Sequence, residues 1–113
     1  MLKFQRKEMR AACAKPGVVI PVLECGGLAV HRPLSEGIDF VLSKRDWKIS
    51  HFASGMGMSG YISTRKVAKE AILKILALNT VDWTQPADTL NPILEDRRIL
   101  DSVKRILQEA ERS

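Results

Sequence analysis

The fold is decided by residues 46–78, DWKISHFASGMGMSGYISTRKVAKEAILKILAL. In the first half, apolar and β-favouring residues flank Ser54-Gly55, a pair typical of a two-residue turn. After Ile62, apolar residues recur with the spacing of one helical face. This stretch therefore predicts a β-hairpin that runs directly into an amphipathic helix.

The predicted turn sets which residues face each other in the hairpin. Counting outward from it places His51 opposite Met58. Further out, Trp47 faces Ile62. Side chains alternate between the two faces of a strand, so these residues share one mostly apolar face. The other face is expected to carry Lys48, Ser50, Phe52, Ser59 and Tyr61.

The helix is predicted to begin after Ser63 or Thr64, because either hydroxyl is able to accept a hydrogen bond from the first turn. Asn79 is expected to close it in the left-handed conformation. Its buried stripe is expected to consist of Val67, Ala68, Ala71, Ile72, Ile75 and Leu76.

Three cations crowd the start of this helix. Arg65, Lys66 and Lys69 lie where the helix dipole is already positive, which disfavours each exposed cation by about 0.3 to 1 kcal/mol. Free backbone amides beside cations form a receptor for an anion such as a phosphate oxygen. The alternative is a solvated basic face, partly relieved by Glu70 paired with Lys74.

Residues 46–78 also resemble the C-terminal half of a double-stranded-RNA-binding domain. The matching run is Ser63-Thr64-Arg65-Lys66-Val67-Ala68-Lys69-Glu70-Ala71, and the resemblance implies that Arg65, Lys66 and Lys69 contact phosphates. The outline is similar as well to the sheet-plus-helix DNA-binding modules of AP2-type factors and phage integrases. The likeness stops before Asp46, where strands are predicted instead of the RNA-binding family's first helix.

Positive charge gathers in two zones of the 113-residue chain, whose net charge is +5. Residues 1–15 hold five cations and one anion, and residues 44–74 hold seven cations and two anions. The second zone adds Lys44, Arg45 and Lys48 to the helix cations. This asymmetry favours nucleic acid, or an acidic protein surface, as the partner.

Upstream of the hairpin, residues 1–15 are expected to form a basic arm or a short helix. Val18–Glu24 and Leu28–Arg32 are predicted as strands joined at Gly26-Gly27. Pro21 lacks a ladder donor, which predicts an edge position for the first of them. Ile38–Leu42 is predicted as a further strand that pairs with the strand of Trp47.

Downstream of the helix, Thr80–Thr89 is predicted as a loop with Trp83 as a core anchor. The alternative role for this ring, and the role considered for Phe52 and Tyr61, is stacking on unpaired bases. Asn91-Pro92 predicts the start of a C-terminal helix over 92–111, because proline is favoured at the first helical position. That helix is expected to dock on the sheet or to form a homodimer.

No signature of catalysis, metal binding or membrane insertion is found. The chain has no P-loop, GxGxxG after a strand, HExxH or nucleophile elbow, so we expect no enzyme activity and no cofactor. Cys13 and Cys25 with His31 and His51 lack the paired spacing of a structural zinc site. Without an apolar span of about 18 residues or a signal peptide, the protein is expected to be cytoplasmic.

Together these features predict one α+β domain over residues 16–113. It is expected to contain a mostly antiparallel sheet of four to five strands, packed by one central helix and the C-terminal helix. The expected function is non-enzymatic nucleic-acid binding, with phosphates held by Arg65, Lys66, Lys69, Lys44, Arg45 and Lys48. The alternative is a phage or plasmid inhibitor of the anti-CRISPR type, which binds a host nucleoprotein complex.

Overall fold

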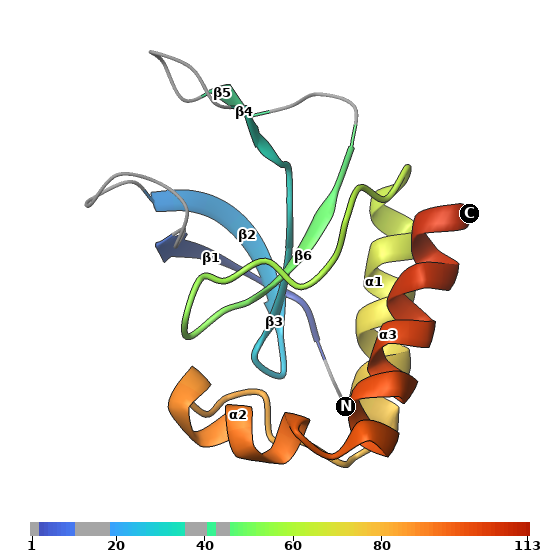
Figure 1. The fold of residues 1–113 in the computed structure, drawn as a ribbon. Helices are drawn as coiled ribbons and strands as arrows, with labels where there is room; N and C mark the ends of the chain where they lie inside the picture. Colours follow the sequence, from blue (N-terminus) through green and yellow to red (C-terminus); the bar gives the residue numbers. More distant parts are fainter. Residues whose placement is uncertain (1–2, 11–18, 36–40, 43–45) are drawn as a thin grey trace.

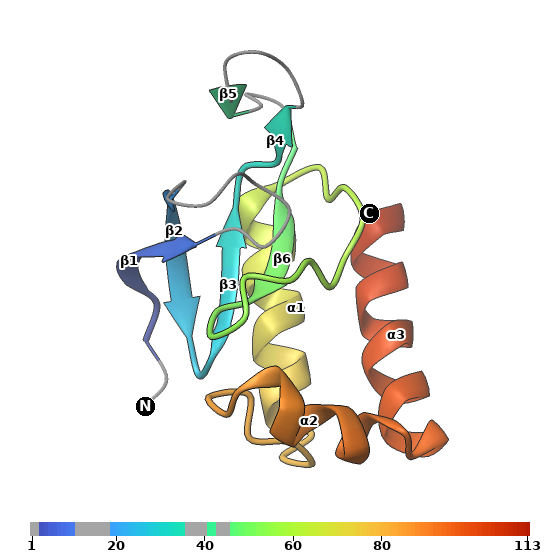
Figure 2. The same cartoon turned by 60° about the vertical axis from the view of Figure 1, so that its left-hand side comes forward.

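The computed structural model describes residues 3–10, 19–35, 41–42 and 46–113, and confirms the predicted α+β class. One face of an antiparallel sheet is covered by helices, and a shorter helix crosses the end of this layer (Figures 1 and 2). The elements in these residues are β1 Gln5–Arg10, β2 Val19–Cys25, β3 Leu28–His31, β4 Leu34–Ser35, β5 Val41–Leu42, β6 Lys48–His51, α1 Arg65–Ala77, α2 Ala87–Leu94 and α3 Arg97–Arg112.

The main sheet has the strand order β1-β2-β3-β6, with every neighbouring pair antiparallel. The predicted turn at Gly26-Gly27 joins β2 to β3, and both glycines have positive φ, 59° and 94°. A Cβ on Gly27 would lie 2.3 Å from the backbone of Trp83. Glycine is therefore required there by both the turn and the close approach of the later loop.

Residues 5–10 form a strand, β1, instead of the predicted basic arm or short helix. They pair with β2 from Gln5 opposite Glu24 to Arg10 opposite Val19. Met9 is the one buried residue of β1. The segment therefore lacks the alternation of apolar and polar residues from which a strand is predicted. This pairing makes β2 an inner strand, which corrects its predicted edge position. Pro21 is tolerated because β3 pairs with β2 only from Leu23 onward.

The strand of Trp47 pairs differently from the prediction. β6 lies beside β3, with Val30 opposite Ile49, instead of beside residues 38–42. Leu42 pairs with Leu34 in a separate two-stranded ribbon, β4-β5, and residues 38–40 lie outside the described part. This pairing depends on a contact between segments distant in the sequence, because the apolar edge of β3 buries Ile49 completely.

The predicted hairpin is correct at its open end and different at its tip. Trp47 and Ile62 exchange two backbone hydrogen bonds, of 2.8 and 2.9 Å, as predicted. Near the tip, His51 donates to the Met56 carbonyl, so the loop contains four residues instead of two. The returning segment forms two isolated bridges instead of a continuous strand, because extra residues bulge out around Ser59.

Helix α1 matches the prediction at both ends. The Thr64 hydroxyl accepts a hydrogen bond from the Val67 amide at 3.2 Å. Asn79 has a φ of 51°, the left-handed conformation that ends the helix. The predicted stripe faces the sheet and α3, and its fully buried members are Ala68, Ala71, Ile72 and Ile75.

The C-terminal region contains two helices where one was predicted over 92–111. Pro92 lies inside α2 instead of starting a helix. The chain changes direction at Asp96, which caps α3 by accepting a hydrogen bond from the Arg98 amide at 3.0 Å. The buried residues of α3, among them Val103 and Leu107, belong to the core shared with α1.

The main core lies between the helices and the α1-facing side of the sheet. Trp83 is 3% exposed in this core, which confirms its predicted role as an anchor. Beneath it, His51 links β6 to the later loop. Its Nε2 lies 2.9 Å from the carbonyl oxygens of Trp83 and Gln85. A smaller cluster lies on the other face of the sheet, formed by Met9, Ile20, Val22 and Ala29 with Phe52 packed against it.

No helix among the described residues is long and apolar enough to cross a membrane. Cys25 is a buried free thiol, and burial raises its pKa, which favours the neutral form. The other cysteine, Cys13, lies outside the described residues. Within the described part of the chain, no group of three or more His, Cys, Asp or Glu residues is arranged to hold a metal ion.

Candidate nucleic-acid interface

The three cations at the start of α1 have different surroundings. The Arg65 guanidinium carbon lies 5.6 Å from the centre of the Trp47 ring. The Lys69 ammonium lies 4.8 Å from the centre of the Phe4 ring. These two positions are one helical turn apart, so they share the side of α1 that faces the sheet. Lys66 points around the helix from them and is exposed.

Arg65 borders a concave surface of about 320 Å³ that we call the basic groove. Three arginines from three segments border it: Arg6 of β1, Arg32 after β3, and Arg65 of α1. Lys7 of β1 also lines it, but its ammonium lies on the opposite face of the sheet, 5.3 Å from the centre of the Phe52 ring. Among the described residues that line it, none carries a carboxylate. The remaining lining residues are Pro21, Val22, Leu23, Val30, His31 and Trp47.

The sheet register explains how Arg6 reaches the groove. Arg6 lies opposite Leu23, which lies opposite Val30, so the three side chains form one row across the sheet. The row continues to Ile49 of β6, on the face that α1 covers. Helix α1 packs over β3 and β6, and Arg6 lies at the uncovered end of the row.

Trp47 connects two of the groove's cations. The Arg32 guanidinium carbon is 3.9 Å from the centre of the indole ring, while Arg65 approaches the same ring from α1. Arg32 also donates to the Asp46 carbonyl at 3.5 Å. The partly buried ring therefore holds two positive charges close together through cation–π contacts.

His31 lines the groove from β3, but its ring points to the other face of the sheet, toward Ser50, as a neutral side chain. Its Nδ1 donates to the Arg32 carbonyl at 2.8 Å, because a carbonyl only accepts. Its Nε2 is then left to accept from the Ser50 hydroxyl at 2.7 Å. Burial lowers the pKa of His31, and the nearby Lys48 charge lowers it further, against the opposing effect of the Arg32 carbonyl.

The structure separates the other predicted site residues from the basic groove. The Lys48 ammonium lies 5.4 Å from the centre of the Tyr61 ring, on the sheet face away from α1. Phe52 lies on that face too, in the small cluster, with the Lys7 ammonium 5.3 Å from its ring centre. The remaining two candidates, Lys44 and Arg45, lie outside the described residues.

The sequence-based prediction missed Arg6 and Arg32 as members of one site. The charge excess of residues 1–15 was a signal, but only pairing with β2 places that segment beside α1. Lys7 also forms an ion pair with Glu24, with 2.7 Å between Nζ and Oε1. Its charge is therefore partly compensated, unlike those of Arg6, Arg32 and Arg65 within the described residues.

Comparison of the chain with protein-family models, curated proteins and solved structures found no match.

Proposed function

We propose that this chain is a small nucleic-acid-binding protein that acts without chemistry and contacts phosphates through the basic groove. The observation that carries the proposal is the convergence of Arg6, Arg32 and Arg65 on one concave surface whose described lining contains no carboxylate. Like charges held together repel each other, so an anion that binds among them relieves this repulsion.

The chemistry of the groove suits a phosphate backbone. Arginine presents a planar fork of donors that matches two phosphate oxygens at once. The three cations of the groove are all arginines. The capped start of α1 adds a positive helix end at the same border. The likeness of residues 46–78 to double-stranded-RNA-binding domains and to AP2- or integrase-type modules supports the same class of partner.

A salt titration tests the proposal. The full chain is titrated with heteropolymeric duplex and single-stranded DNA and RNA, with binding followed by fluorescence anisotropy between about 50 and 200 mM salt. For three phosphate contacts, the log–log slope is expected to be about −2.7 on duplex DNA and about −2.1 on single strands. Failure to bind any of these at the lowest salt would remove the proposal.

Charge reversal then localises the contact. Arg32→Glu combined with Arg65→Glu is expected to abolish most binding and to flatten the salt slope. The matched control is Arg97→Glu with Arg98→Glu, two exposed cations at the start of α3. The control changes the net charge equally, so an equal loss of binding would show that overall charge, and not the groove, holds the nucleic acid.

The remaining predicted cations are tested in the same assay. Lys66→Glu and Lys48→Glu change charges on other sides of the molecule, and the proposal expects smaller losses from them than from Arg65→Glu. The alternative drawn from the sequence, an anti-CRISPR-type inhibitor, predicts that free nucleic acid is ignored and that the cations meet an acidic protein surface instead.

A further inference from the structure

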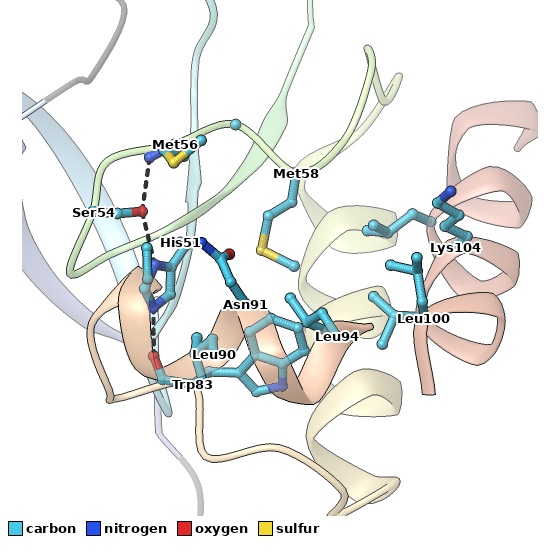
Figure 3. A pocket seen from close by; sticks show the side chains of 14 residues that line it. His51, Ser54, Met56, Met58, Trp83, Leu90, Asn91, Leu94, Leu100 and Lys104 are labelled. Atoms are coloured by element: carbon cyan, nitrogen blue, oxygen red, sulfur yellow. Dashed lines mark hydrogen bonds between the residues drawn. The ribbon is translucent and has the colours of Figure 1, made fainter. Parts of the chain in front are cut away.

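A second concave surface lies away from the basic groove, and one wall of it is the segment Met56-Gly57-Met58. It encloses about 240 Å³ between this segment, α2 and α3. Figure 3 shows His51 and Ser54 on one side, Leu94 and Leu100 on the other, and Met58 between them. We call this surface the methionine pocket.

The floor of the methionine pocket is buried and apolar. Trp83, Leu90, Val103 and Leu107 line it and belong to the buried main core. His51 adds no free ring nitrogen. Its Nε2 donates to backbone carbonyls, and its Nδ1 accepts from the Ser54 hydroxyl at 2.7 Å. Any molecule in the pocket therefore meets a hydrophobic floor and not a reactive group.

The rim of the pocket is adaptable. Met56 is 56% exposed and Met58 is partly buried, and both are unbranched side chains that adjust to differently shaped apolar surfaces. Glycines flank them. Gly55 has a φ of 70°, and a Cβ on Gly57 would meet nothing within 4 Å. Space around the segment therefore allows the methionines to close on a bound molecule.

Charge at the pocket is limited to one sign. Among the described residues that line it, Lys104 alone is charged, and no described carboxylate lies within 4 Å of its ammonium. Lys104 lies on α3 and is exposed at the rim, one turn after Leu100. A single cation beside an apolar pocket complements a ligand with one anionic end.

We propose that the methionine pocket binds a compact apolar molecule with one anionic group, such as an aromatic carboxylate. The apolar part would rest on Trp83 and Leu90, and the carboxylate would lie beside Lys104. The size agrees, since an apolar cavity of about 150 Å³ in another protein takes up benzene and this one encloses about 240 Å³. This inference is independent of nucleic-acid binding.

The probe is 1-naphthoate, with the neutral 1-naphthalenemethanol as comparator. Both are titrated into the native full chain by isothermal calorimetry at pH 7.5, and both are expected to bind at one site. Lys104→Met is expected to weaken 1-naphthoate binding about two- to fivefold, the effect of one partly exposed ion pair. Binding of the alcohol is expected to stay unchanged.

Two further variants test where the ligand binds. Leu94→Trp fills the pocket from a partly buried position, and is expected to weaken both compounds at least about tenfold. Arg105→Met removes an exposed cation from the same helix outside the pocket lining, and is expected to change neither affinity. Because Lys104 is exposed, its substitution tests the proposal even where Leu94→Trp fails to fold.

Several results would overturn the proposal. One is the absence of saturable heat from the native chain at about 1 mM of either compound. Another is unchanged binding to a folded Leu94→Trp variant, which would place the ligand elsewhere. Equal effects of Lys104→Met and Arg105→Met would refute the role of Lys104 in selecting an anion.

Discussion

Replacing His51 by Phe should show how strongly one buried imidazole joins β6 to the loop that carries Trp83. His51 is 5% exposed, and its Nε2 hydrogen is shared by the Trp83 and Gln85 carbonyls. Phenylalanine keeps a ring of similar shape but removes this donor and the acceptor for Ser54. The substitution therefore separates hydrogen bonding from packing.

The expected loss of stability depends on which hydrogen-bond partners of His51 stay buried, out of reach of water, after the imidazole is removed. The Trp83 carbonyl meets His51 in a buried contact, so losing the donor costs about 1–3 kcal/mol. The Ser54 hydroxyl and the Gln85 carbonyl are only part-buried in their contacts, so together they add about 1 kcal/mol. The free energy of unfolding is thus expected to fall by about 2–4 kcal/mol, which lowers Tm by about 4 °C per kcal/mol in a chain of this length.

Urea unfolding followed by circular dichroism measures this loss, with Ser54→Ala as the matched control. The control removes only the part-buried bond to His51 Nδ1 and is expected to cost less than about 1 kcal/mol. Equal losses in the two variants would refute the reasoning. Nitrogen NMR offers a second check, since two carbonyl acceptors beside Nε2 require a hydrogen on that nitrogen of His51.

Three further predictions concern the fold. Gly27→Ala is expected to destabilise the protein by more than about 2 kcal/mol in urea unfolding, because φ is 94° and the new Cβ would meet the Trp83 backbone. Since burial lowers the folded pKa of His31, its stability contribution is complete above the unfolded value near 6.5 and is lost as pH falls below it. The free energy of unfolding should therefore fall by at most about 1.4 kcal/mol per pH unit there, and His31→Asn should flatten this profile. Thr64→Ala should cost about 1 kcal/mol in thermal unfolding, and Ser63→Ala much less, because only Thr64 caps α1.

The candidate site shows where prediction from sequence stops. Arg65 was identified because its charge conflicts with the helix dipole, a conflict between neighbouring positions. Arg6 and Arg32 carry no such local signal, and their roles depend on the pairing of β1 with β2 and on the position of Trp47. Lys48 was assigned to the same site because it is near in sequence, yet strand alternation places it on the opposite face.

The sequence by itself determined the features that depend on residues within a few positions of one another. The cap and end of α1, its buried stripe, the Gly26-Gly27 turn and the Trp47–Ile62 pair all belong to this class. Turn chemistry, capping and periodicity act between near neighbours, so the pattern of residue types contains them.

Only the tertiary structure decided the partners of the strands and, through them, the surfaces. The addition of β1 to the sheet, the placement of β6 beside β3 and the division of the last helix gather distant segments into the basic groove and the methionine pocket. These choices depend on which of several apolar edges buries most area and satisfies most backbone groups. That comparison involves the whole chain, and no local pattern encodes it.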